Sequence, residues 1–439
     1  MRTSRALLLT FVLLLTPTLF AQYLRYETEY PAIGYSTNSP TDTIAKLQEA
    51  INNDEIKLEF EAKTGYLSSL LQALKIDSHS QLLVFSKSSF QTGLISSKTP
   101  RALYFNDDTY VGWVQRGPNI EISSVDKRLG PVFYTLRQEE RDYPILERKN
   151  SLCLRCHDTY SLTGGGVPRY LMGSGLTNKN GQTVFHAGWH LTSDQTPLKK
   201  RWGGWYVTGT HGKQRHLGNL IVAKTDSTKQ LDLETGANII DLNTLIDTTP
   251  YISQHSDIVA LLIMEHQIHV QNVLTRVNYD TVNLIHNQQK RKNEREASEI
   301  GTEKIVELTE PLVRALLLSN EAPLVDPISG FSNFAVNFVN LGPKDKQGRS
   351  LRELDLTTRL FQYPCSYLIY SESFKSLPNI TKRQVYSRLW EILSGEDQSK
   401  PFDHLSNKDR AAILKILMDT DTNFTAAKPT RKIAPNAST

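Results

Sequence analysis

Two cysteines and a histidine stand within five residues of one another, at Cys153, Cys156 and His157. Thiols and imidazole at this spacing support three kinds of chemistry. The pattern C-x-x-C-H attaches haem c, because the two thiols add to the vinyl groups of haem while the adjacent histidine binds the iron. The same residues can instead supply part of a zinc site, or the two cysteines can form a redox-active dithiol.

The rest of the chain favours haem over these alternatives. A structural zinc site usually takes four ligands in two closely spaced pairs, and the third cysteine, Cys365, stands alone far along the chain. A thioredoxin-like dithiol needs a β–α–β context, which the glycine-rich sequence after the motif does not suggest. We therefore predict one haem c per chain, attached covalently at Cys153 and Cys156, with His157 as the proximal iron ligand.

The segment around residues 150–170 resembles the haem-binding part of c-type cytochromes. CLRCH is followed there by TGGGVP, and in that family a proline past the histidine presents a carbonyl group to the outer nitrogen of the imidazole. By this resemblance Pro168 is expected to belong to the haem site. The resemblance implies haem binding rather than any particular activity.

A second segment, RWGGWYVTGTHG, alternates large flat side chains with glycine. This composition lets aromatic rings stack on a porphyrin while the backbone comes close, although an aromatic strand followed by a turn is an equal alternative. We predict Trp205 as a haem contact and His211 as the candidate distal iron ligand. RWGGWYVTGTHG and YPCSYLIYSESF are also similar to segments of large bacterial proteins that carry a single cytochrome c motif.

Another candidate for the distal side lies on a long predicted helix. His266 and His269 share a face of that helix with aliphatic residues, and Glu265 borders the face. If the iron keeps an open position, Glu265 and His266 are the acid–base candidates for a peroxidase-like reaction. Thioether ligation is a further alternative, and it would come from one of three methionines, Met172, Met264 or Met418.

Three functions are compatible with these residues. The favoured one is an exported monohaem c-type cytochrome that transfers single electrons to a redox partner protein. The alternatives are a haem c enzyme with an open distal position, and a haem-based redox or gas sensor or binding module. The 50 basic and 46 acidic residues give a formal net charge of +4, a balance that argues against nucleic acid as a partner.

The N-terminus predicts export. Arg2 and Arg5 precede a short apolar run at 6–15, and small residues lead to a plausible cleavage point after Ala21. This is the order of a signal peptide, and no later stretch has the ~18 consecutive apolar residues of a transmembrane helix. We expect residues 1–21 to be removed and the mature chain to be periplasmic or otherwise exported, where bacteria attach haem c.

The periodicity of the chain predicts a mixed α+β fold, with a β-rich N-terminal and central part around the haem segment and a helical C-terminal third. Strands are predicted within 81–137 and at 204–210 and 216–224. Helices are predicted at 43–53, 64–75, 256–290, 303–319, 381–395 and 407–420, with Thr64 and Asn407 as caps and an interruption at Pro311.

These patterns divide the chain into regions after the signal peptide. We predict a mixed α+β region at 22–150, a haem-binding region with Gly- and aromatic-rich strands at 151–250, a mainly helical region at 251–424 and a disordered tail at 425–439.

Overall fold

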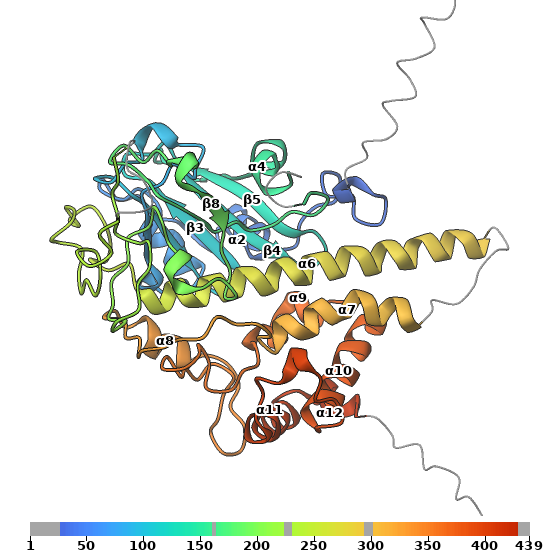
Figure 1. The fold of residues 1–439 in the computed structure, drawn as a ribbon. Helices are drawn as coiled ribbons and strands as arrows, with labels where there is room; N and C mark the ends of the chain where they lie inside the picture. The colour runs from blue at the N-terminus through green and yellow to red at the C-terminus, as the bar shows by residue number, and fades with distance from the viewer. Residues whose placement is uncertain (1–26, 160–163, 224–230, 294–301, 429–439) are drawn as a thin grey trace, which may run out of the picture.

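The computed structural model describes residues 27–159, 164–223, 231–293 and 302–428 (Figure 1). The predicted signal peptide and the part of the predicted disordered tail beyond Lys428 lie outside these ranges. The mixed α+β class is confirmed, because strands dominate the N-terminal and central part and helices the C-terminal part. Within the described ranges no helix is long and apolar enough to cross a membrane.

One antiparallel sheet organises the first half of the chain, and its six strands pair in sequence order. One face of the sheet packs against two helices, α2 (Thr43–Asn52) and α3 (Leu67–Ala73), and the other face against the long helix α6 (Ile258–Asn293) (Figure 1). The strands are β1 (Leu82–Val84), β2 (Arg101–Phe105), β3 (Thr109–Trp113), β4 (Asn119–Asp126), β5 (Gly130–Arg137) and β6 (Leu146–Arg148).

The helical part packs on the side of α6 that faces away from the sheet (Figure 1). The largest core cluster contains residues of the sheet, of α6 and of the C-terminal helices, so the β-rich and helical parts share one core. The helices in this part are α7 (Thr302–Leu316), α8 (Phe334–Val339), α9 (Glu372–Lys375), α10 (Asn379–Leu393), α11 (Asn407–Thr420) and α12 (Thr422–Ala426).

The two strands predicted at 204–210 and 216–224 are wrong. Within the described residues these segments form only single bridges to other parts of the chain, such as Val84 to Trp205 and Thr208 to Asp257. Trp205, Tyr206 and Val207 are nevertheless buried, whereas Ile221 in the second segment is 47% exposed. The observed second sheet is smaller and lies earlier, between β7 (Gly173–Gly175) and β8 (Trp189–Leu191).

Several predicted helix ends also differ. α3 begins at Leu67 without a side-chain cap instead of at Thr64, and the cap of α11 is Ser406, which forms a capping box with Asp409. α7 continues through Pro311. This residue is exposed, so the helix carbonyl that it leaves without a backbone partner can bind water. α12 extends into the predicted tail.

A glycine at the turn from β4 to β5 lets α6 approach the sheet. Gly130 has φ +69°, and a Cβ atom there would lie 2.3 Å from Cγ2 of Thr275 on α6. Gly130→Ala is therefore expected to destabilise the protein by backbone strain of about 1–2 kcal/mol plus about 1–3 kcal/mol of overcrowding. Gly348→Ala is the control, since Gly348 has φ +79° but open space around it. Urea denaturation should show the larger loss for Gly130→Ala, and equal losses would contradict this contact.

Candidate haem-attachment site

The CLRCH motif forms the last turn and a half of a short helix, α4 (Asn150–His157), which follows β6 and packs on β5. One turn of helix places Cys153, Cys156 and His157 on the same side. Cys153 is half-buried, Cys156 is exposed, and neither forms a disulfide. The helix ends where the backbone N–H of Asp158 donates to the carbonyl of Leu154, 2.9 Å away.

The imidazole of His157 is oriented as a metal-binding imidazole needs to be. Its Nδ1 lies 2.7 Å from the carbonyl oxygen of Arg169, and the backbone N–H of Arg169 donates to the carbonyl of His157 at 2.9 Å. With the Nδ1 proton donated to this carbonyl, Nε2 keeps its lone pair. Burial lowers the pKa of His157, which favours the neutral, ligating form. Pro168, the residue expected to present its carbonyl to the imidazole, is buried next to this contact. The carbonyl that lies near Nδ1 belongs to the next residue, Arg169.

Two neighbouring features hold the histidine in place. The ring of Phe133 on β5 packs against the imidazole, with 4.4 Å between centroids. The glycines that precede Arg169 have positive φ, and at Gly166 (φ +80°) a Cβ atom would lie 2.7 Å from the carboxylate carbon of Glu27. Glycine is therefore needed for the chain to turn back under α4. Sequence reasoning missed Phe133, because nothing local to β5 links it to the motif.

The cysteines do not form a zinc site with the residues that the structure describes. Across the described ranges no three His, Cys, Asp or Glu side chains are grouped so that they could hold a metal ion. Haem attachment makes different demands, because the sulfurs bond to carbon and only the histidine binds the metal.

The predicted haem contact Trp205 lies in the main core, 4% exposed, and its Nε1 donates to the carbonyl of Gly173 at 2.9 Å. The glycines beside it serve close backbone packing: a Cβ atom on Gly203 would lie 2.8 Å from the backbone of Gly175. Packing against β7 therefore explains why aromatic residues and glycine alternate in this segment.

The predicted distal ligand His211 has no free ring nitrogen. It is fully buried, its Nδ1 lies 2.7 Å from the carbonyl oxygen of Gln214, and its Nε2 accepts from the backbone N–H of Asn238 at 3.0 Å. Its ring packs on His216, whose pKa burial lowers to about 3. In this structure His211 is a hydrogen-bonded core histidine, which is the common role of a buried histidine.

Glu265 and His266, the acid–base candidates, are both fully buried. Glu265 pairs with Arg201, with 2.8 Å between Nη1 of the arginine and Oε2 of the glutamate. Nδ1 of His266 lies 2.8 Å from Oδ2 of Asp194, and its Nε2 lies 2.8 Å from Oγ of Ser366. The order carboxylate, imidazole, hydroxyl is that of hydrolytic triads. Because the serine and the histidine are inaccessible to solvent, the arrangement acts here as a buried structural network.

The same network holds His269, which sequence analysis placed on one face with His266. Its Nδ1 lies 2.6 Å from Oδ1 of Asp194, and its side chain is 20% exposed. Burial alone would lower the pKa of His269, but the Asp194 carboxylate outweighs burial and raises it. The histidines in turn hold the pKa of Asp194 below its usual range, although burial opposes this.

These shifts predict a pH dependence of stability. The folded pKa of His269 is raised, so its pairing stabilises the protein fully below the unfolded pKa of about 6.5 and is lost as pH rises through the folded value. The difference in unfolding free energy between wild type and His269→Gln should therefore shrink as pH rises. Urea titrations at several pH values test this, with His286→Gln on the same helix as control. A difference that stays constant with pH would contradict the pairing.

The methionine alternatives are placed differently. Met172 and Met264 are 1% and 2% exposed in the main core, and Met418 on α11 is partly exposed. Two of the three therefore serve packing.

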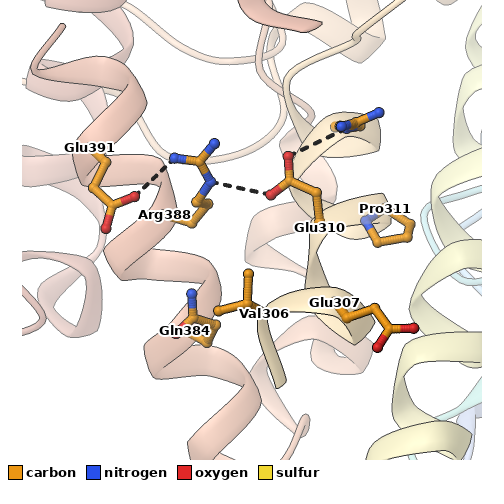
Figure 2. A pocket seen from close by; sticks show the side chains of 8 residues that line it. Val306, Glu307, Glu310, Pro311, Gln384, Arg388 and Glu391 are labelled. Carbon is orange, nitrogen blue, oxygen red and sulfur yellow. Dashed lines mark hydrogen bonds and ion pairs between the residues drawn. The ribbon is translucent and has the colours of Figure 1, made fainter. Parts of the chain in front are cut away.

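A surface groove of about 770 Å³ lies between α7 and α10 (Figure 2). Its charged side chains neutralise one another, because Glu310 accepts from Arg314 and from Arg388, and Arg388 also pairs with Glu391. These pairs join α7 to α10. A fifth charged residue of the lining, Glu307, pairs instead with Lys304.

No family model, curated protein or solved structure matches the chain. The interpretation of the site therefore depends on the residues themselves.

Proposed function

We propose that this protein is an exported monohaem c-type cytochrome that carries single electrons. The observation that supports this best is the geometry of His157, whose Nδ1 is engaged by a backbone carbonyl while Nε2 is left to bind a metal. Two unpaired cysteines precede it on α4, Cys153 one turn earlier and Cys156 immediately before it. Haem c, when bound, would supply an iron that changes oxidation state by one electron.

In this proposal each residue of the motif has a separate task. Cys153 and Cys156 hold the ring by thioether bonds, and His157 binds the iron. Phe133 and the carbonyl of Arg169 fix the orientation of the imidazole. Cys156 is exposed, so the side of the motif that it occupies faces solvent, where a redox partner protein can approach.

Export is part of the proposal. The residues that predict a signal peptide lie outside the described ranges, and the support comes from their order alone: positive charges, a short apolar run and small residues. A periplasmic or otherwise exported location agrees with covalent haem attachment, which requires a haem c maturation system.

The visible spectrum of the ferrous protein, made in a bacterium that attaches haem c, tests the proposal. A pyridine haemochrome typical of two thioether bonds and a sharp low-spin α band are expected from a protein with two axial ligands. A broad high-spin spectrum that changes with carbon monoxide would overturn electron transfer as the main role. A colourless protein would overturn haem binding itself.

A further inference from the structure

The segment that follows α7 contains two residues with a strained backbone. Leu318 has φ +53° and Asn320 has φ +65°. Both lie in the left-handed region, which asparagine tolerates and leucine rarely adopts. A residue keeps this conformation only where its surroundings hold it there. The segment from 318 to 322 therefore depends on contacts with other parts of the chain.

Hydrogen bonds attach the 318–322 segment to the loop that follows β8. The backbone N–H of Ala322 donates to the carbonyl of Asp194 at 2.9 Å. Nε2 of Gln195 donates to the carbonyl of Ser319 at 3.0 Å. Two neighbouring residues of this loop thus hold the strained segment near both of its ends.

The side chain of Asp194 belongs to the histidine network described above, so the residue that holds Ala322 also carries charge. Its carboxylate lies 2.8 Å from Nδ1 of His266 and 2.6 Å from Nδ1 of His269. His269 is 20% exposed, so it can exchange protons with solvent. Because imidazole changes charge near neutral pH, Asp194 has a positive neighbour at low pH and loses it as pH rises.

Glu321 places a second titratable group within the segment itself. Its Oε1 accepts from the backbone N–H of Leu360 at 2.9 Å. Burial raises the pKa of Glu321 to about 7, and the charge of Asp194 adds to this effect. Glu321 is therefore neutral at mildly acidic pH, and it becomes a second carboxylate close to Asp194 as pH rises.

Two arginines near Glu321 oppose this increase of its pKa. Each of them is already paired with another carboxylate. Nη1 of Arg201 lies 2.8 Å from Oε2 of Glu265, and Nη2 of Arg359 lies 2.7 Å from Oδ1 of Asp409. The arginines therefore weaken the repulsion that an ionised Glu321 meets, but the pKa of this residue stays raised.

Both titratable groups change the charge of this site in the same direction. As pH rises, His269 loses a positive charge and Glu321 gains a negative one, while Asp194 stays ionised. The folded pKa of each group is raised above its unfolded value. The stabilisation is therefore complete below the unfolded pKa, about 4.5 for Glu321 and about 6.5 for His269, and is lost as pH rises through the folded values.

We propose that residues 318–322 form a pH-sensitive latch, closed while His269 and Glu321 are protonated and released as both lose their protons. Release relieves the strain at Leu318 and exposes the carboxylate of Glu321 to water. The segment begins beyond the end of α7, so its release requires no helix to unfold. The inference is independent of haem and of the proposed function.

Hydrogen exchange of the Ala322 amide in the wild-type protein tests the latch. The measured rate is divided into the rate of an unstructured peptide at the same pH, which removes the intrinsic effect of pH. This protection factor should fall by about tenfold or more between about pH 5 and pH 7, because opening is coupled to proton loss. Constant protection would overturn the latch. If Ala322 is protected as strongly as the amides of β4 at every pH, the segment opens only with the whole protein, and the latch is likewise refuted.

Replacement of Glu321 by glutamine separates the latch from other effects of pH. Glu321→Gln keeps a neutral acceptor for its backbone donor and cannot ionise, so protection of Ala322 should depend less on pH. Glu321→Gln/His269→Gln should remove the dependence. Glu372→Gln is the matched control and should keep the wild-type profile, because this carboxylate is 81% exposed and pairs with Lys375. A wild-type profile in the double variant would contradict the proposal. If that variant does not fold, the comparison of Ala322 with β4 in the wild type decides.

Discussion

Serine at both Cys153 and Cys156 is expected to abolish covalent haem completely. Both thiols are free, and the thioether bonds that attach haem c form at cysteine sulfur. Haem-stained denaturing gels and intact mass should show haem in the wild type and none in the double variant. A single replacement should leave one thioether, and the pyridine haemochrome of that variant should shift to longer wavelength because one vinyl group stays conjugated with the ring.

The third cysteine is the internal control for this experiment. Cys365 is fully buried, and burial raises the pKa of its thiol to about 12, so it has little thiolate character. Cys365→Ser should keep a full complement of haem. Haem that survives denaturation of the Cys153→Ser/Cys156→Ser protein would show that attachment occurs elsewhere and would remove the basis for the proposed function.

The sequence predicts the sheet and the long helices well, because their signals are local and repeated. Strands β2 to β5 are short runs of β-branched and aromatic residues separated by turn residues, and α6 shows helical periodicity over many turns. The same reasoning fails at 204–210. There, glycines let aromatic side chains pack into the core although the backbone forms no continuous strand pairing. The prediction fails because such a segment has the same local composition as a strand.

The chemistry of the site is predictable only as far as the motif extends. Cys153, Cys156 and His157 follow from spacing, and the structure adds a backbone carbonyl, that of Arg169, 2.7 Å from Nδ1 of the histidine. What surrounds them comes from distant parts of the chain. Phe133 belongs to a strand that precedes the motif, and the partner of Glu265 is Arg201, far earlier in the sequence. Such contacts depend on tertiary packing, which a local pattern does not encode.

The buried pair of Arg201 and Glu265 predicts the largest effect on stability. The side chains are 3% and 0% exposed, and burial raises the pKa of Glu265 although the charge of Arg201 opposes this. Arg201→Met would leave a buried carboxyl group without its partner. Removal of one member of a buried ion pair typically destabilises a protein by about 3–5 kcal/mol. Urea denaturation of the holoprotein should show a loss of this size.

A double-mutant cycle separates the pair from the other contacts of Arg201. Its guanidinium also donates to the carbonyls of Asp194 and Thr196, so part of the loss belongs to them. Arg201→Met/Glu265→Leu should recover much of the stability, because an apolar pair leaves no buried charge. The exposed pair of Lys304 and Glu307 is the control, and Glu307→Gln should cost less than about 1 kcal/mol. A double variant that loses as much unfolding free energy as the two single variants together would show that the two charges are not coupled.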